Sequence, residues 1–376
     1  MLSACATPAG IDLPARGKWL CGLNSRQINH LQNTAQVKQI IGGKTPQPPA
    51  LQAAVAPAAP AARLIEVDAE SEGQRLDNFL MRQLKGVPKT HVYRIIRSGE
   101  VRINKGRVSA DTRVHSGDQV RLPPVRVSEK MAEKAAHPAP AREFPALLED
   151  EHLMAIDKPA GVAVHGGSGV SFGVIEQLRQ ARPQAKFLEL VHRLDRETSG
   201  ILLVAKKRSA LTHLQDQFRE RETGKTYLAL VSGSWPANKK VIDTPLHKYL
   251  QPDGERRVRV TTADDPDGMR SITLVKVRAT APAQPLRGLP AMSLLEVTIK
   301  TGRTHQIRVH LASSGHPIAG DDKYGDFELN KRLQKAGLKR MFLHAWRLQF
   351  THPASGARTE LHAELPPELA AFAPSP

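Results

Sequence analysis

Residues 192–200 read His-Arg-Leu-Asp-Arg-Glu-Thr-Ser-Gly and place one carboxylate, Asp195, among basic residues. Neighbouring cations favour the charged form of an acid, so this side chain is expected to be ionised. The apolar run at 201–205 is typical of a strand, whose edge would aim Asp195 into a cleft. There the carboxylate could act as a nucleophile or a general base. The alternative is a turn residue or a helix cap, as for most loop aspartates.

A tyrosine lies on another predicted strand. Residues 225–230 read Lys-Thr-Tyr-Leu-Ala-Leu, and Tyr227 is one of only four tyrosines in the chain. Its ring offers a flat face to a nucleobase, and its hydroxyl offers a proton or a hydrogen bond. A half-buried core tyrosine is the alternative.

Residues 301–310 gather two arginines and two histidines where a strand turns into a helix. They read Thr-Gly-Arg-Thr-His-Gln-Ile-Arg-Val-His. Helix starts bind anions, and Arg308 could pair with a carboxylate through two hydrogen bonds, orienting that acid. Phosphate contact or a surface salt bridge are the alternatives.

Motifs for cofactors and metals do not fit the chain. Residues 166–169, Gly-Gly-Ser-Gly, lack the Gly-Lys-Ser/Thr end of a phosphate-binding loop and predict a tight turn at a cleft wall. His305 and His310 are five residues apart, where a zinc-binding helix spaces its histidines by four. The serine-hydrolase motif Gly-x-Ser-x-Gly is also missing. We therefore expect no metal and no cofactor, nucleotide or other, and interpret most histidines as surface or packing residues.

The composition points to a polyanionic partner. The 376 residues include 54 Lys and Arg against 37 Asp and Glu, a net charge of +17, and the pI is about 10.1. Such an excess favours RNA, DNA or an anionic surface. Both cysteines, Cys5 and Cys21, lie near the N-terminus, which supports neither a disulfide framework nor a zinc site. No apolar run is long enough for a membrane span, and the start lacks the features of a secretory signal, so a cytoplasmic protein is expected.

The chain divides by composition into several segments. Residues 1–62 contain a single acid, Asp12, and end in a Pro/Ala tract, which predicts a disordered or linker-like extension. An organellar transit peptide or a misassigned start are alternatives. Residues 64–126 form a small unit, 127–143 a linker, 144–369 one large domain and 370–376 a tail.

The small unit alternates short strands and helices. The patterns predict strands at 64–67, within 99–106 and at 117–122, one helix from Leu76 to Leu84 and a second opened by Pro88. Basic residues outnumber acids between 74 and 126, which favours RNA contact over an ordinary solvated face. The candidate RNA-binding residues are Lys89, Arg94, Arg97, Arg102 and Lys105.

The large domain mixes strand-like and helix-like runs. Strands are predicted at 153–156, 201–205, 227–231, 272–277, 294–299 and 348–350, and helices at 174–180, 211–221 and 305–313. Because the runs do not alternate strictly, we predict an α+β fold with a mixed, largely antiparallel sheet.

These motifs together resemble the signature of the RluA/RluC/RluD family of RNA pseudouridine synthases. The resemblance is carried by residues 192–200 and 203–206, with 157–161, 225–229, 301–308, 320–325 and 343–345. The small unit resembles the S4 RNA-binding domain through residues 74–80 and 99–104. Residues 121–127 and 164–169 resemble the RluC branch, whose members modify large-subunit ribosomal RNA. The first 62 residues are not covered by this likeness.

The resemblance implies roles for individual residues. Asp195 matches the catalytic aspartate, and Arg308 the arginine that pairs with it. Tyr227 matches the tyrosine that stacks on the target uracil, with removal of the C5 proton as a second role. Arg193 matches the residue that fills the gap left by the flipped base. Contacts with the base or the RNA are expected from Leu343, His192 and Arg303.

The implied activity is isomerisation of uridine to pseudouridine in 23S ribosomal RNA, or in an assembling large-subunit particle, by a monomer without membrane contact. Two alternatives stay open at this point: a sibling synthase acting on other ribosomal sites or on tRNA, and a non-catalytic assembly factor that only binds ribosomal RNA. Whether Asp195 attacks C1′, adds to the ring or removes a sugar proton also stays open.

Overall fold

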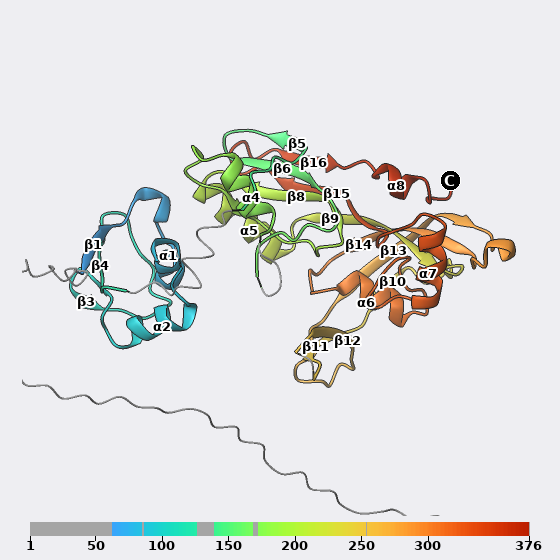
Figure 1. Ribbon diagram of the computed structural model, residues 1–376, viewed down its shortest axis with the longest axis horizontal. Coiled ribbons are helices and arrows are strands. Elements are labelled where there is room, and N and C mark those ends of the chain that lie inside the picture. Colours follow the sequence, from blue (N-terminus) through green and yellow to red (C-terminus); the bar gives the residue numbers. More distant parts are fainter. Residues whose placement is uncertain (1–61, 85, 126–138, 168–171, 253, 376) are drawn as a thin grey trace, which may run out of the picture. The chain divides into compact units, whose positions relative to one another are not determined.

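The computed structural model describes residues 62–84, 86–125, 139–167, 172–252 and 254–375 (Figure 1). Nearly all of the extension predicted at 1–62 and most of the linker predicted at 127–143 lie outside these ranges. Within the described residues, no helix combines the length and apolar character that crossing a membrane requires.

The small unit has a four-stranded antiparallel sheet in the order β1-β4-β2-β3. Its elements are β1 (Arg63–Glu66), a 3₁₀ turn (Ala69–Ser71), α1 (Leu76–Gln83), α2 (Lys89–Arg97), β2 (Arg102–Ile103), β3 (Gly106–Arg107) and β4 (Gln119–Leu122). Pro88 is the residue before α2, where its restricted φ suits a helix start. Asn104 and Lys105 both have positive φ, as a tight two-residue hairpin turn requires. The predicted strands and helices of this unit are confirmed.

Helix α2 shows how the unit separates its core from its basic surface. Val92, Ile95 and Ile96 are buried in a cluster whose members all belong to the small unit. The five predicted RNA-binding side chains are all exposed: Lys89, Arg94, Arg97, Arg102 and Lys105. The unit therefore has a hydrophobic core of its own and offers its cations to solvent.

The large domain is built on a ten-stranded sheet in the order β10-β13-β14-β9-β15-β8-β6-β5, with β16 paired to β15 and β7 to β8. All pairs are antiparallel except β15 with β8. The strands are β5 (Ala146–Glu149), β6 (Leu153–Lys158), β7 (Glu189–Leu190), β8 (Ser199–Ala205), β9 (Gly224–Ser232), β10 (Val241–Asp243), β13 (Ile272–Ala281), β14 (Met292–Ile299), β15 (Leu343–Thr351) and β16 (Arg358–His362). The predicted α+β fold with a mixed, largely antiparallel sheet is confirmed.

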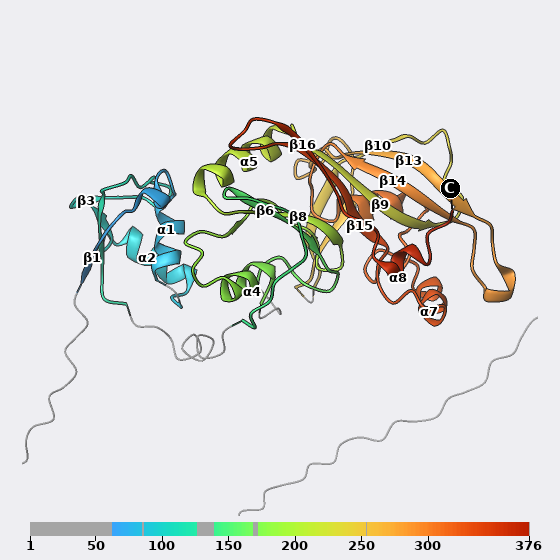
Figure 2. The ribbon, with the colours of Figure 1, turned by 90° about the horizontal axis from the view of Figure 1, so that it is seen from above.

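Strand β8 is apolar without interruption because helices cover both of its faces. Leu202 and Val204 pack with α4 (Val174–Ala181), whereas Ile201 and Leu203 pack with α5 (Arg208–Glu220). Figure 2 shows the two helices on opposite sides of β6 and β8. Sheets buried on both faces lose the alternation of apolar and polar residues that a half-exposed strand shows.

Strand β9 divides its residues in the same way. Tyr227, Ala229 and Val231 face the cluster that contains α6 (Gln306–Ser313). Leu228 and Leu230 face the cluster that contains α7 (Phe327–Lys335) and α8 (Pro367–Ala370). Phe372 and Ala373 pack against this second cluster, so folded contacts extend into the predicted tail.

The two parts of the sheet meet where β8 runs parallel to β15 over two residue pairs, His344 with Ser199 and Ala345 with Gly200. Gly200 has φ +106°, and a Cβ atom there would lie 2.3 Å from the Ala345 carbonyl oxygen. Only glycine permits such a close approach in this conformation. The junction places the loop before β8 beside the start of β15.

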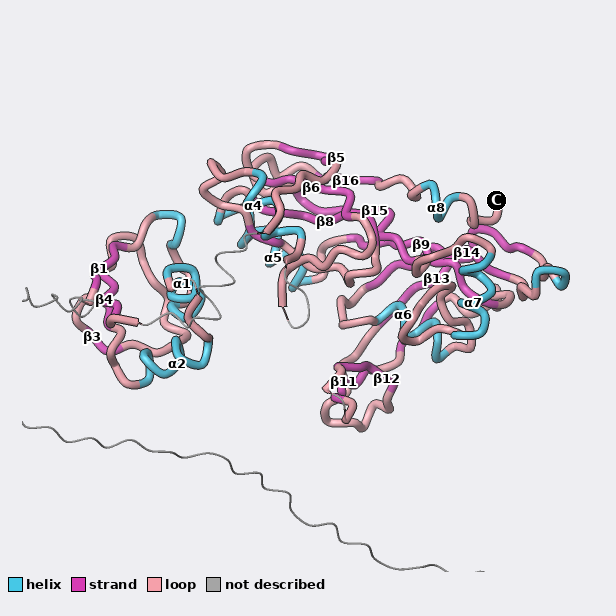
Figure 3. Tube along the Cα trace, viewed as in Figure 1, coloured by secondary structure: helices cyan, strands magenta, loops and turns pink. Residues whose placement is uncertain are grey.

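Several short elements were not predicted from the sequence. A separate two-stranded sheet, β11 (Leu246–Leu250) with β12 (Arg256–Val260), stands apart from the large sheet (Figure 3). Helix α7 buries only Leu329 and Leu333. Too few apolar positions recur in such elements for a period to be recognised.

The separate cores lead to the first prediction. Deleting residues 64–126 should weaken RNA binding and lower its salt dependence, because phosphate contacts release counterions with a slope of about 0.9 per contact in duplex nucleic acid. The rate at saturating RNA should change little. The measurement is RNA affinity across a salt series.

A triple alanine variant at Lys89, Arg94 and Arg97 serves as the matched control, because these exposed side chains can be truncated without touching the core. It should shift the salt slope in the same direction. An unchanged slope in both proteins would show that the small unit does not bind the phosphates.

Candidate active site

Asp195 lies in the loop between β7 and β8. Leu194 before it is buried in the core with Leu202 and Val204, and Thr198 after it donates its backbone N–H to the Asp195 carbonyl (3.1 Å). The Asp195 side chain keeps 21% of its surface exposed. The loop is therefore anchored on both sides while its carboxylate faces a cleft, as the sequence predicted.

A completely buried lysine anchors this loop through hydrogen bonds to backbone carbonyl groups. The Lys158 ammonium donates to the carbonyl oxygens of Pro159 and Val162 (2.8 Å each) and of Arg196 (3.1 Å). The Gly161 N–H donates to the same Arg196 oxygen (2.9 Å). Burial, with repulsion from Arg340, lowers the pKa of Lys158 to about 7. The residue that follows Asp195 is thus fixed through its carbonyl by a buried ammonium.

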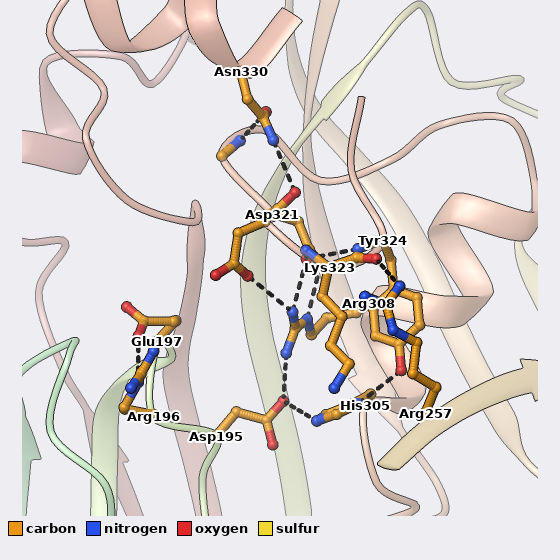
Figure 4. A network of polar contacts seen from close by, with 12 residues as sticks. Asp195, Arg196, Glu197, Arg257, His305, Arg308, Asp321, Lys323, Tyr324 and Asn330 are labelled. Atoms are coloured by element: carbon orange, nitrogen blue, oxygen red, sulfur yellow. Dashed lines mark hydrogen bonds and ion pairs between the residues drawn. The ribbon is translucent and has the colours of Figure 1, made fainter. Parts of the chain in front are cut away.

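Arg308 connects Asp195 to a second, buried acid (Figure 4). Its Nε and Nη2 donate to the two carboxylate oxygens of Asp321 (2.8 and 2.7 Å), and its Nη1 donates to Asp195 Oδ2 (3.3 Å). Burial opposes the charge of Arg308, but Asp321 and then Asp195 outweigh it and raise the pKa. The bidentate partner is therefore Asp321, and Asp195 receives one hydrogen bond, because a guanidinium has enough donors to bridge two acids.

Asp321 is itself held by its neighbours. The backbone N–H groups of Lys323 and Tyr324 donate to Asp321 Oδ1 (2.8 and 3.0 Å), and Asn330 Nδ2 donates to its carbonyl (2.8 Å). Burial works against ionisation of Asp321, but Arg308 prevails and lowers the pKa. The acid stays charged and keeps the guanidinium in place.

His305 approaches the same oxygen of Asp195. Its Nε2 lies 3.8 Å from Asp195 Oδ2, and its Nδ1 lies 2.9 Å from the hydroxyl of Tyr324. The residue precedes α6 with φ 52°, a left-handed conformation that is uncommon outside glycine. Burial lowers the pKa of His305. A neutral imidazole therefore lies beside the carboxylate.

Tyr227 and Leu343 line the cleft from neighbouring strands, β9 and β15. Burial, with a smaller effect of the Asp195 charge, raises the pKa of the Tyr227 phenol. A protonated phenol can stack and donate a hydrogen bond at neutral pH, but it is a poor acceptor of a carbon-bound proton. Both roles predicted for Tyr227, stacking and removal of the C5 proton, stay predictions.

The cleft has a volume of about 530 Å³. Its only carboxylate among the described lining residues is Asp195, against seven cations: Arg193, Arg219, Arg221, Lys225, Lys300, Arg303 and Arg308. A second lobe of about 400 Å³ adjoins it and shares Arg193, Asp195, His305 and Arg308. The first cleft attracts a polyanion and presents it to one acid, whereas the second lobe is also lined by Glu197, Glu255 and Asp322.

Comparison with known proteins decides the family. The model of the RNA pseudouridylate synthase family matches residues 152–313, and that of the S4 domain matches residues 74–120. Ribosomal large subunit pseudouridine synthase C of Salmonella typhi is 50% identical over 316 residues, which cover 82% of this chain and 95% of that protein. The protein of the same name from Escherichia coli K12 is 49% identical over 312 residues, covering 81% and 94%.

This chain belongs to the RNA pseudouridine synthase family. Among solved structures, human RNA Pseudouridylate Synthase Domain Containing 1 is similar with a TM-score of 0.50 and 25% identity, covering 62% of this chain and 89% of that one. The protein is thus an RNA pseudouridine synthase with an S4 domain.

The seven site residues predicted in the large domain of the synthase all line this one cleft: His192, Arg193, Asp195, Tyr227, Arg303, Arg308 and Leu343. Arg193 is exposed and borders both lobes. Arg303 is half-buried, and its Nε donates to the Arg270 carbonyl (3.4 Å). The roles assigned to these residues stay predictions.

His192 has a structural setting that the sequence did not indicate. Its Nε2 accepts the backbone N–H of Leu203 (3.1 Å), and its ring stacks on Phe218 at 4.7 Å. Burial, with repulsion from Lys225, lowers the pKa of His192 to about 4. A neutral, engaged ring is better suited to holding the loop against β8 than to binding phosphate.

Four residues of the site received no role from the sequence: Lys158, His305, Asp321 and Tyr324. Lys158, Asp321 and Tyr324 lie in segments 157–161 and 320–325, which carry the family resemblance. The sequence showed charged or hydroxyl-bearing side chains within these segments. The spacing of the segments along the chain did not reveal that these side chains lie close to Asp195.

Other predicted features lie near or outside the cleft. Gly167 lines the second lobe, and the Gly166 N–H donates to Glu176 Oε2 (3.0 Å), whereas Ser168 and Gly169 lie outside the described residues. Among the described residues, one group could hold a metal ion: His247, Asp265 and Asp267, whose ligand atoms lie within 4.8 Å of one another. None of these three lines the cleft.

Replacing Arg308 by lysine tests the bridge between the two acids. A lysine ammonium keeps the charge but cannot bind Asp321 bidentately while also reaching Asp195. We expect kcat to fall by about 100-fold with RNA affinity nearly unchanged, as for an interaction needed in the transition state.

The matched control is Arg182→Lys, which alters a guanidinium that also bridges two acids, Glu143 and Glu149, but lies outside the cleft. Single-turnover rates and binding curves are the measurements. Equal rates for Arg308→Lys and wild type would contradict the role of the bridge.

The lowered pKa of Lys158 predicts that the unfolding free energy depends on pH. Its pKa falls from 10.5 in the unfolded chain to about 7 on folding. Between these values the unfolded state binds the proton and the folded state does not, so the unfolding free energy rises with pH by about 1.4 kcal/mol per unit. Chemical denaturation of wild type and Lys158→Met from pH 6 to about pH 10 measures this slope. The methionine variant should lack the rise, and parallel curves would refute the titration.

Proposed function

We propose that this synthase isomerises specific uridines of large-subunit 23S ribosomal RNA to pseudouridine, with Asp195 as its catalytic carboxylate. The observation that carries the proposal is a single acid, contacted by buried Arg308, in a cleft whose described lining includes seven cations and Tyr227. The choice of RNA is supported by relatives about 50% identical and named for the ribosomal large subunit.

The reaction needs no outside reagent. The N1–C1′ bond of uridine breaks, the uracil turns, C5 bonds to C1′, and the proton leaves C5 while N1 gains one. Atoms and electrons balance within one nucleotide, so the protein must supply an ionised carboxylate near C1′ and a surface that keeps the freed ring from escaping. The three routes open to the aspartate all require this same charge.

The target base must first leave its stack. Flipping a nucleotide out of a helix costs a few kcal/mol. Stacking on Tyr227 would return about 1–3 kcal/mol. We assign Arg193, exposed at the border of both lobes, to the space that the base vacates, and Leu343 to an apolar contact with the base.

Affinity for the RNA comes from outside the reacting centre. The cations of the cleft and of the small unit would contact phosphates, which supply most of the affinity without reading sequence. We assign residues 64–126 to RNA binding and 144–369 to catalysis, in a monomer that works in the cytoplasm on ribosomal RNA or on an assembling large-subunit particle.

The experiment is a pseudouridine map. Purified protein is incubated with unmodified 23S transcript, and carbodiimide labelling with primer extension locates the product. Small-subunit RNA, a tRNA pool and precursor particles form parallel arms. Stops confined to the large-subunit RNA or its particle support the proposal, and stops confined to the other arms contradict the choice of RNA.

Asp195→Asn should abolish product formation while RNA affinity stays within about two-fold, because the variant removes a charge and keeps the shape. Asp264→Asn, an equal change at an exposed position outside the cleft, should behave as wild type. Turnover by Asp195→Asn above about one per cent of wild type would exclude a nucleophile or base at this position.

A further inference from the structure

The two oxygens of Asp195 have different surroundings. Arg308 Nη1 (3.3 Å) and His305 Nε2 (3.8 Å) both approach Oδ2. Figure 4 shows these two contacts converging on one oxygen. Within the part of the chain that the structure describes, Oδ1 has no hydrogen-bond partner. One oxygen is held by the protein, and the other belongs to a side chain that lines the cleft and is 21% exposed.

The neighbours of His305 determine which of its nitrogens carries the proton. The backbone N–H of Val258, on β12, donates to the Tyr324 hydroxyl oxygen (3.0 Å). Among the described residues, His305 Nδ1 (2.9 Å) is the only acceptor within hydrogen-bond distance of this hydroxyl, so the Tyr324 proton is satisfied only by donation to it. Since an accepting Nδ1 is bare, a neutral imidazole must hold its proton on Nε2, the nitrogen that faces Asp195.

The electrostatics agree with a neutral ring and a protonated phenol. Burial lowers the pKa of His305, the charge of Asp195 opposes that shift, and Arg308 and Lys323 add to it. Burial raises the pKa of Tyr324. Both groups therefore have the protonation states that the chain of hydrogen bonds requires.

We propose that His305 is a positioning residue: Tyr324 fixes its tautomer, and its Nε2–H, together with Arg308, directs Asp195 so that Oδ1 meets the nucleotide. The inference rests on the proposed role of Asp195 as the catalytic carboxylate. The 3.8 Å separation is longer than a hydrogen bond, and such contacts often tighten when the substrate binds.

The backbone supports a specific placement of this ring. His305 has φ 52°, a left-handed conformation that is strained for a residue with a Cβ. The following Gln306 stabilises the turn, because its Oε1 accepts the Arg303 N–H (3.1 Å) and the Thr301 hydroxyl (2.8 Å). Backbone strain held by surrounding bonds is common where a side chain must be aimed.

The first test reads the tautomer directly and needs no RNA. Nitrogen NMR of histidine-labelled protein separates a protonated ring nitrogen from a bare one, and the signal missing from His305→Asn identifies the residue. We expect a bare Nδ1 and a protonated Nε2 in wild type and in the control Tyr249→Phe. In Tyr324→Phe the other tautomer should become populated. A protonated Nδ1 in wild type would overturn the proposal.

The second test separates positioning from folding. His305→Asn suits the left-handed backbone and removes the Nε2–H, whereas His305→Gln places an amide N–H near the position of Nε2. We expect the asparagine variant to lower the single-turnover rate by about ten-fold or more with RNA affinity unchanged, as expected for a lost hydrogen bond to a charged group. The glutamine variant should recover part of the rate.

A wild-type rate in His305→Asn, or equal losses in the asparagine and glutamine variants, would overturn the proposal. Absence of pseudouridine with wild-type protein would contradict the proposed function instead, and the NMR result would still decide the orientation of His305. Thermal unfolding of each variant verifies that it folds.

Discussion

The site depends on one buried ion pair. Arg308 and Asp321 are 5% and 1% exposed, and their two parallel hydrogen bonds fix the guanidinium so that its remaining edge reaches Asp195. A buried pair costs desolvation energy that its attraction only partly returns, and such pairs often add little stability. Here the pair has another benefit, because it holds the Arg308 guanidinium at Oδ2 of Asp195 and leaves Oδ1 of Asp195 unused.

The arrangement also explains why the acid can work inside a cationic cleft. Seven lysine or arginine side chains line the space, yet among them only Arg308 contacts Asp195. The others are free of that carboxylate and can neutralise phosphates. Under the proposed function, affinity and chemistry would be carried by different cations of one cavity, and the charge of the acid would not be cancelled by the groups that bind the RNA.

Much of this could be predicted from the sequence. The strands around 201–205 and 227–231 were evident because burial on both faces leaves unbroken apolar runs, and the motifs around Asp195, Tyr227 and Arg308 identified the cleft. The bidentate partner of Arg308 could not be predicted, because the loop after α6 brings Asp321 to it.

His192 was predicted to contact the RNA, but in the structure its ring packs on Phe218 and accepts a backbone hydrogen bond. The spacing of the motif gives no sign of these contacts. Short elements such as α7 escaped because two buried residues define no period.

The parallel junction of β8 and β15 has a consequence for how this enzyme can evolve. The acid comes from the loop before β8, whereas Tyr227, Leu343 and Arg308 come from strands and a helix on the other side of the junction. Only two residue pairs join the sides there, and Gly200 allows the backbones to meet. A side chain at position 200 would collide with the Ala345 carbonyl and break this two-pair register, whereas substitutions in the outer strands β5 and β10 leave it intact. We therefore expect change to be tolerated at the outer strands and not at Gly200, because the register there sets how far Asp195 lies from Tyr227 and Leu343.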